Sequence, residues 1–190
     1  SNDQKLAFLI NAYNAFTVKL ILKQDSRPDS IRDIGSIFSG PWSQRFFTLL
    51  GEERTLDELE HQMIRGNPSL MDPRIHFAVN CASVGCPALR PEAYTGEWMD
   101  AQLADSTRRF LSDRRRNRYD AEAGVLRVSS IFDWYQEDFE DSAGGLGDYL
   151  LQYADALALP AEARRNLEAG DLPVRFLDYD WSLNTASNNP

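Results

Sequence analysis

The fold is decided by residues 72–87, which read DPRIHFAVNCASVGCP. Both cysteines of the chain, Cys81 and Cys86, lie in this stretch, and so does His76, one of its two histidines. The short apolar run 75–79 predicts a buried strand, and the small residues that follow predict a loop. A strand that passes into a glycine-containing loop with two thiols is a place where a functional site can form.

The two cysteines differ in their expected orientation. Side chains alternate between the two faces of a strand, so His76 and Asn80 would share one face, while Cys81 would point to the other. Cys86 lies beyond a loop that can turn back toward His76. We therefore expect Cys86 to be the better nucleophile, with Cys81 as the second candidate.

A cysteine nucleophile is the first of three chemistries for these side chains. The thiol needs a base within hydrogen-bonding reach, and often a third group that orients the base. His76 is the first candidate for the base. His61 is the second, with Glu60 or an asparagine as its orienting group. The alternative without catalysis is a buried Cys81 and a core His76, which is the commoner fate of such residues.

The other two chemistries are a disulfide and a metal site. A bond between Cys81 and Cys86 can close so short a loop, and it would rule out a thiol nucleophile in that state. Zinc is the least favoured, because His61 and His76 both precede the cysteines and lie too far apart for a finger pattern. We expect no metal and no cofactor.

Composition narrows the class of protein. The chain has 190 residues, 43% of them hydrophobic, which is enough for one domain with its own core. Its formal net charge of −9 argues against general nucleic-acid binding, because phosphate backbones would repel it. No apolar run approaches the roughly 20 residues that cross a bilayer, so we expect no membrane span. Nothing in the pattern predicts an oligomeric state.

The hydrophobic periodicity predicts an α+β fold, a mostly helical single domain with a small antiparallel sheet. Helices are expected over residues 3–23, 30–34, 55–65, 95–111, 130–143, 146–157 and 160–169. Hairpins are expected over residues 44–55 and 118–128, and a last strand over residues 174–177.

Several polar residues sit on apolar helix faces and are candidates for a site. Asn11 and Asn14 share a flank of the first helix, where buried amides need partners. We expect them to tie this helix to neighbouring loops, with substrate binding as the alternative. Glu60 falls inside the apolar arc of its helix, which is unusual for a carboxylate. His61 and Arg65 lie together on the flank of the same helix.

Five segments together resemble the DUF547 family, a domain of unknown function. The segments are 10–16 (INAYNAF), 30–34 (SIRDI), 56–65 (LDELEHQMIR), 72–87 with Tyr94, and 179–184 (YDWSLN). The resemblance runs from Leu6 to Asn184, and its typical N-terminal lead-in is not seen here. It implies one DUF547-like domain over residues 1–190. A trimmed signal peptide, and with it a periplasmic location, stays open.

The resemblance also bears on activity. The family's shared residues correspond to Asn11, Asn14, Glu60, His61, Arg65, His76, Cys81 and Cys86. A similarity to papain-like thiol hydrolases would require a permuted arrangement or a different fold, because both histidines precede both cysteines here. We expect a cysteine-dependent hydrolase acting on a peptide or amide bond. The alternative is a non-catalytic binding module whose Cys81–Cys86 loop is structural.

Overall fold

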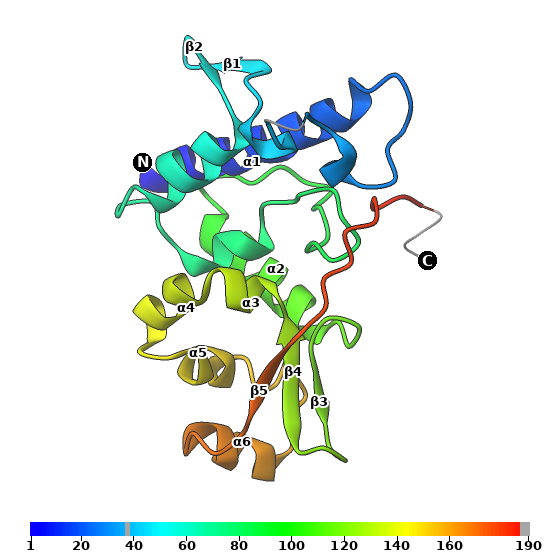
Figure 1. The fold of residues 1–190 in the computed structure, drawn as a ribbon. Coiled ribbons are helices and arrows are strands. Elements are labelled where there is room, and N and C mark those ends of the chain that lie inside the picture. The colour runs from blue at the N-terminus through cyan, green and yellow to red at the C-terminus, as the bar shows by residue number, and fades with distance from the viewer. Residues whose placement is uncertain (37–38, 187–190) are drawn as a thin grey trace.

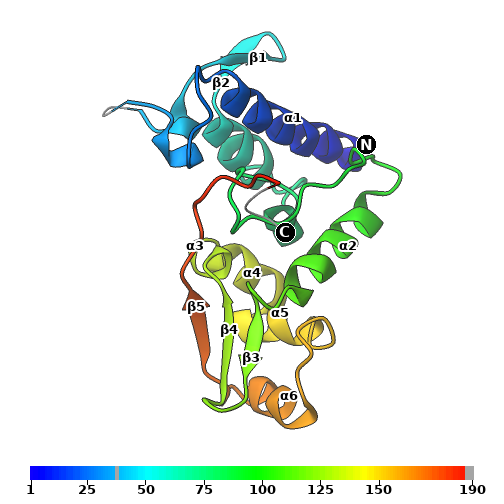
Figure 2. The same ribbon diagram turned by 90° about the vertical axis from the view of Figure 1, so that its right-hand side faces the viewer.

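The computed structural model describes residues 1–36 and 39–186. Its elements form two groups, one above the other in Figure 1, with residues 72–87 between them. The upper group holds helix α1 (Asn2–Leu22), the short helices η1 (Ile31–Asp33) and η2 (Pro41–Ser43), the hairpin strands β1 (Phe47–Leu49) and β2 (Glu52–Arg54), and the π-helix η3 (Glu58–Arg65). The view turned by 90° shows α1 running across the upper group, below the β1–β2 hairpin (Figure 2).

Helix α1 forms the centre of the upper group. A capping box fixes its start, because the Ser1 side chain accepts from the Gln4 backbone and the Gln4 side chain accepts from the N-terminal amine. Ile10 and Tyr13 are almost completely buried against Leu59 and Ile64 of η3, within one hydrophobic cluster. A capping box precedes η3, since Thr55 N donates to the Glu58 side chain and Glu58 N donates to the Thr55 side chain.

The lower group is built around a second hydrophobic cluster. It contains helices α2 (Met99–Ser112), α3 (Ile131–Trp134), α4 (Gln136–Ala143), α5 (Leu146–Gln152) and α6 (Ala161–Glu168), and strands β3 (Arg118–Asp120), β4 (Val125–Ser129) and β5 (Val174–Leu177). Strand β4 pairs antiparallel with β3 and parallel with β5. The predicted α+β class is confirmed, and the parallel β5 is an addition to the antiparallel hairpins.

The prediction of a strand at residues 75–79 is wrong. Residues Pro73–Phe77 form a short 3-10 helix, η4, in which Pro73 occupies the first turn and the Asp72 side chain accepts from the Arg74 backbone. Proline at that position and an aspartate cap both favour a helical start, and so short an apolar run fits either element. The argument from alternating strand faces therefore does not apply to His76, Asn80 and Cys81.

Helix η4 connects the two hydrophobic clusters. Ile75 is fully buried in the upper cluster, together with Ala78 and Val79. Phe77, two residues after Ile75, is fully buried in the lower cluster, where its ring packs against Phe110 and Phe132. The side chain between them, His76, is thus held between two cores and has little freedom to move.

The end of the chain also connects the two groups. After β5 it runs back up to the upper group, as the orange and red segment in Figure 1 shows. The backbone of Ser182 bridges to Ser30, and that of Leu183 bridges to Ser83. Gly85 N donates to Asp180 O at 2.9 Å, which ties this segment to the cysteine loop.

Helix α1 meets the length and composition of a membrane-spanning helix, contrary to the expectation from the sequence. Its most apolar 18-residue window has a mean hydropathy of 1.3, and 44% of that window is buried inside the fold. Core helices of soluble proteins and signal sequences have the same properties. The buried apolar residues of α1 belong to the upper core, whereas Phe8, Val18 and Leu22 are exposed.

The two asparagines of α1 hydrogen-bond to loop backbone, which is the first of the two roles expected for them. Asn14 Nδ2 donates to Ala78 O at 2.9 Å, and its Oδ1 accepts from Asn80 N at 2.8 Å. Asn11 makes the same pair of bonds with the backbone of Tyr94. Each amide therefore satisfies two backbone groups of a loop, which otherwise would be unpaired.

Replacing Asn14 is expected to destabilise the fold. Asn14→Ala leaves the buried Ala78 carbonyl and Asn80 amide without partners, which costs about 2–3 kcal/mol of unfolding free energy. Urea denaturation followed by circular dichroism measures this loss. Lys5→Ala, at an exposed position of the same helix, is the control and should change stability by less than about 0.5 kcal/mol. An equally small effect of Asn14→Ala would contradict the structural role.

Candidate functional site

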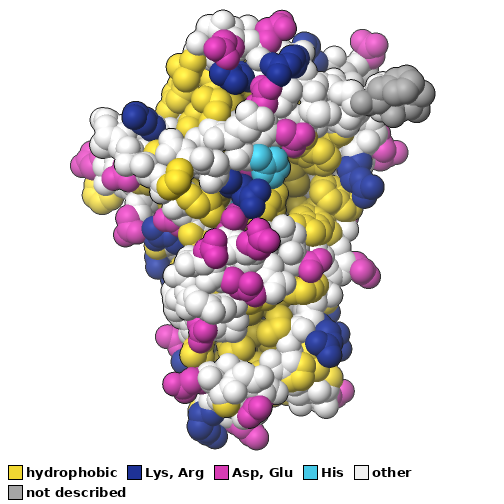
Figure 3. Space-filling view, turned by 60° about the vertical axis from the view of Figure 1, so that its left-hand side comes forward, with side chains coloured by type: hydrophobic (Ala, Val, Ile, Leu, Met, Phe, Trp, Pro, Cys, Tyr) yellow, Lys and Arg dark blue, Asp and Glu magenta, His cyan; other side chains and the backbone are white. Residues whose placement is uncertain are grey.

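The candidate site is a cavity of about 210 Å3 between the two groups of elements. It collects side chains from η2, η3, η4, the cysteine loop, α3 and the end of the chain. Its lining residues are Tyr13, Trp42, Asp57, Glu60, His61, His76, Val79, Cys81, Cys86, Pro87, Ile131, Trp134, Tyr135, Tyr179 and Trp181. Figure 3 shows a face on which a histidine lies beside hydrophobic side chains and acidic ones gather nearby.

His76 is positioned by a carboxylate from the lower group. Its Nε2 lies 2.7 Å from Asp138 Oδ2, on α4. Asp138 also accepts from Arg65 Nε at 2.7 Å and from Arg65 Nη2 at 3.1 Å, which is a bidentate pair. On its face, the His76 ring stacks on Tyr135 with the centroids 3.8 Å apart.

The same contacts fix the protonation state of His76. Burial would raise the pKa of Asp138, but the hydrogen bonds from His76 and Arg65 outweigh burial and hold that pKa at about 2. An ionised carboxylate can only accept, so the proton of the imidazole is on Nε2. Burial lowers the pKa of His76 against the opposing effect of Asp138, so the ring is neutral at pH 7. Nδ1 then carries a lone pair, and it is buried without a hydrogen-bond partner among the described residues.

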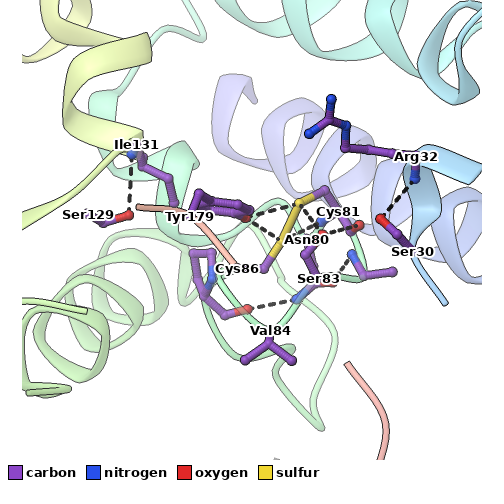
Figure 4. The surroundings of a disulfide bond; sticks show 12 residues. Ser30, Arg32, Asn80, Cys81, Ser83, Val84, Cys86, Ser129, Ile131 and Tyr179 are labelled. Atoms are coloured by element: carbon purple, nitrogen blue, oxygen red, sulfur yellow. Dashed lines mark hydrogen bonds between the residues drawn. A yellow bond between two sulfur atoms is a disulfide. The ribbon is translucent and has the colours of Figure 1, made fainter. Parts of the chain in front are cut away.

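Cys81 and Cys86 form a disulfide in the wall of the cavity. Of the three chemistries considered from the sequence, a free thiol, a disulfide and a metal site, the structure contains the disulfide. Figure 4 shows Tyr179 pointing at the bond. Cys86 Sγ accepts from Cys81 N at 3.0 Å and from the Tyr179 hydroxyl at 3.1 Å. Gly85 is required here, because a Cβ would lie 2.8 Å from the Tyr179 ring.

The two cysteine residues differ in exposure. Cys86 is 2% exposed, whereas Cys81 is half-buried. Both line the same cavity as His76, so the expectation that Cys81 faces away from His76 is wrong. The cause is the helical η4, which replaces the expected strand.

Glu60 is buried and hydrogen-bonded to phenols. Its Oε1 accepts from the Tyr135 hydroxyl at 2.7 Å, and Tyr13 is a second hydrogen-bonding neighbour. Burial raises the pKa of both tyrosines, and the nearby Glu60 charge raises each further. The pKa of Asp57, three residues before Glu60, is also raised. Burial is the largest cause, the charge of His61 opposes it, and the charge of Glu60 adds to it.

His61 occupies the rim of the cavity. Its Nδ1 lies 2.9 Å from Arg65 Nη1, and since arginine only donates, this nitrogen is an acceptor. Its Nε2 lies 3.9 Å from Asp57. Glu60, its expected orienting group, is bonded to tyrosines instead. His76, with a free lone pair, is therefore better placed to act as a base than His61.

The structure brings together most of the candidate residues. His76, His61, Glu60, Cys81 and Cys86 all line the cavity. The other four have structural partners: Asn80 holds the cysteine loop through Pro87 O and Ala82 N, Arg65 holds Asp138, and Asn11 and Asn14 hold loops. Over residues 1–36 and 39–186, no three His, Cys, Asp or Glu side chains are placed to hold a metal ion.

Sequence reasoning missed Asp138 and most of the aromatic wall. Asp138 is one of several acidic residues on its helix, and nothing in the sequence separates it from Glu137 or Asp141. Trp134, Tyr135 and the other aromatic residues of the lower group read as ordinary core positions. Among the aromatic residues of the wall, Tyr13, Tyr179 and Trp181 gave a signal, because they belong to the segments 10–16 and 179–184 that resemble DUF547.

Residues 1–111 match the sequence model of the family described as "Protein of unknown function, DUF547". The match covers more than half of the 190 residues and includes the cysteine loop. Asp138 and the segment 179–184 lie beyond it. No curated protein and no solved structure matches the chain, so nothing supports a similarity to papain-like hydrolases.

The buried His76 is expected to make the fold sensitive to acid. Its pKa is lowered in the folded state from an unfolded value of about 6.5, so the unfolded chain binds more protons below about pH 7, and stability falls between about pH 7 and 5. Asp138, with a folded pKa of about 2, adds a further loss between about pH 4 and 2.

Urea midpoints at pH 7, 6 and 5 measure this dependence. His76→Gln cannot titrate and should flatten the change between pH 7 and 5, even though it lowers stability at pH 7. His61→Gln, which replaces the other, exposed histidine, should keep the dependence of the unaltered chain. A curve for His76→Gln parallel to that of the unaltered chain would contradict the assignment.

Proposed function

The chain belongs to the DUF547 family, and we propose that it is a thiol hydrolase that cleaves a peptide or other amide bond in the cavity described above. In this proposal Cys86 is the nucleophile after reduction of the disulfide. His76 is the general base, and Asp138 orients it.

The observation that carries the proposal is the state of His76. Its Nε2–H donates a hydrogen bond to the Asp138 carboxylate. The lone pair of the ring is therefore on Nδ1, which is buried and has no hydrogen-bond partner in the described structure. A buried polar atom without a partner costs about 1–3 kcal/mol, and such costs concentrate at functional sites. A disulfide sulfur has no proton to donate, whereas the thiol of reduced Cys86 has one. A base and a cysteine in one cavity, with a carboxylate that orients the base through its other nitrogen, are the parts that nucleophilic catalysis requires.

The surroundings of Cys86 favour its thiolate. Cys81 N–H and the Tyr179 hydroxyl both donate to this sulfur, and donors of this kind stabilise a thiolate; the Tyr179 hydroxyl also lies 3.2 Å from Cys81 Sγ. Burial raises the pKa of Tyr179, so this hydroxyl keeps its proton. Tyr179 is then available to donate to the oxyanion in the transition state. Asn80, considered for that role from sequence, is occupied by the loop backbone.

The proposed reaction has three steps. An external dithiol first reduces the Cys81–Cys86 bond and is itself oxidised. Cys86 Sγ then attacks the substrate carbonyl while its proton passes to His76 Nδ1. The carbon–nitrogen bond breaks, and the amine leaves with that proton. Water activated by His76 finally hydrolyses the thioester and restores the thiol.

The disulfide itself favours a second candidate, a non-catalytic binding pocket. With both sulfurs bonded, the loop between Cys81 and Cys86 is rigid and no thiol is free among the described residues. In this case the unpartnered His76 Nδ1 would accept a hydrogen bond from a bound ligand.

Alkylation and hydrolysis together test the proposal. After reduction, iodoacetamide should modify Cys86 rapidly at pH 7, and a library of fluorogenic peptide amides should give turnover. Cys86→Ser should abolish turnover, and His76→Gln should lower it by about 100-fold or more, the contribution of a general base. The readouts are mass spectrometry of the modified peptide and the release of fluorophore.

The matched variant Cys81→Ser separates the two candidates. It cannot form the disulfide, so the proposed hydrolase should work in this variant without added reductant. If reduced protein and Cys81→Ser give no turnover, and Cys86 is alkylated no faster than a free cysteine, the hydrolase proposal fails and the binding pocket remains.

A further inference from the structure

The cavity is lined by acidic and aromatic side chains, and by no lysine or arginine among the described residues. Asp57, the residue before η3, and Glu60, on η3, lie three residues apart and both line the cavity. Arg32 and Arg65 each place a guanidinium over a lining ring, Trp181 and Tyr135 respectively, yet neither lines the cavity.

Glu60 is a buried carboxylate without a cation of its own. It is 5% exposed, and its described hydrogen-bonding neighbours are the hydroxyls of Tyr135 and Tyr13. No ion pair joins it to a described Lys, Arg or His. The contrast with Asp138 is direct, because Asp138 has Arg65. Burying an unpaired charge is costly, so a carboxylate kept in this state suggests a cation that comes from outside.

The remaining wall fits the apolar part of such a ligand. Trp42, Trp134 and Trp181 form a continuous set of ring contacts, with centroids 5.8 Å and 5.4 Å apart. Aromatic rings pack against methylene groups and attract ammonium and guanidinium ions. A cavity of about 210 Å3 is smaller than the roughly 300–1,000 Å3 of pockets for drug-sized ligands. It therefore has room for one side chain or a small amine.

A second buried polar group points to a ligand independently of the carboxylates. His76 also lines the cavity, its side chain is fully buried, and its Nδ1 lacks a partner in the described structure. This lone pair can accept a hydrogen bond from the ligand, at a point separate from Glu60.

We infer that the cavity binds a positively charged group, a primary ammonium or a guanidinium on an aliphatic chain, with Glu60 as its counter-ion and the tryptophans around the chain. For the substrate this means a lysine-like or arginine-like side chain beside the bond that is cleaved. As a statement about the substrate, the inference rests on the proposed hydrolase. As a statement about binding, it holds for the oxidised protein, where Cys86 is not free.

Calorimetric titration of the oxidised protein with matched probes tests the inference. The probes are the N-acetyl methylamides of lysine, arginine and norleucine; norleucine has an aliphatic chain without the charge. At pH 7 the lysine or arginine probe should bind at least about tenfold more tightly than norleucine, the value of one charge-assisted hydrogen bond. Equal affinities, or no binding of either cationic probe, would overturn the inference.

The variant Glu60→Gln identifies the counter-ion. It keeps a carbonyl to accept from Tyr135 but removes the charge, so the preference for the cationic probe should disappear. Glu162→Gln, on the exposed side of α6, removes one charge far along the chain and should leave the preference intact. A preference that survives Glu60→Gln would overturn the role of Glu60. Selective binding without turnover in reduced protein would instead remove only the hydrolase.

Discussion

The carboxylate of Asp138 is the contact on which the arrangement of the two groups depends. It lies on α4 of the lower group and accepts hydrogen bonds from His76 on η4 and from Arg65 on η3. Two neighbouring elements, η3 and η4, therefore meet α4, whose Asp138 follows His76 by 62 residues in the chain, at one charge. The low pKa of Asp138 keeps its carboxylate ionised at neutral pH, so the neutral imidazole that it holds carries its proton on Nε2.

Two carboxylates of the site illustrate opposite uses of buried charge. Asp138 is neutralised by a bidentate arginine and serves to position a neighbouring ring. Glu60 has the hydroxyls of Tyr135 and Tyr13 as hydrogen-bonding neighbours and forms no ion pair with a described residue, although the Arg65 charge acts on it from a distance. Asp138 thus has its counter-ion within the protein, whereas the Glu60 carboxylate makes the cavity electrostatically negative. The Cys81–Cys86 disulfide forms part of the cavity wall, so the chemistry of that wall depends on the redox state of the two cysteines.

Much of the fold follows from patterns that are local in the sequence. The capping boxes at Ser30 and at Thr55, the hairpins and the α1 helix need only neighbouring residues to be identified. Residues 75–79 were misassigned because a five-residue apolar run satisfies a strand and a 3-10 helix equally. The site was predicted through its rare residues, Cys and His. Asp138 was out of reach, since its role arises from a contact 62 residues away in the chain from His76.

The return of the last segment to the upper group has a consequence for biosynthesis. A ribosome makes the chain from its N-terminus, so α1, η3 and the cysteine loop emerge long before Tyr179 and Trp181. A nascent chain that has both cysteines but not this segment lacks the hydroxyl beside their sulfurs and one of the three tryptophans of the wall. Both cysteines are thus made before the tyrosine that contacts them. A chain that is still being synthesised therefore cannot form the complete cavity until Tyr179 and Trp181 have been added.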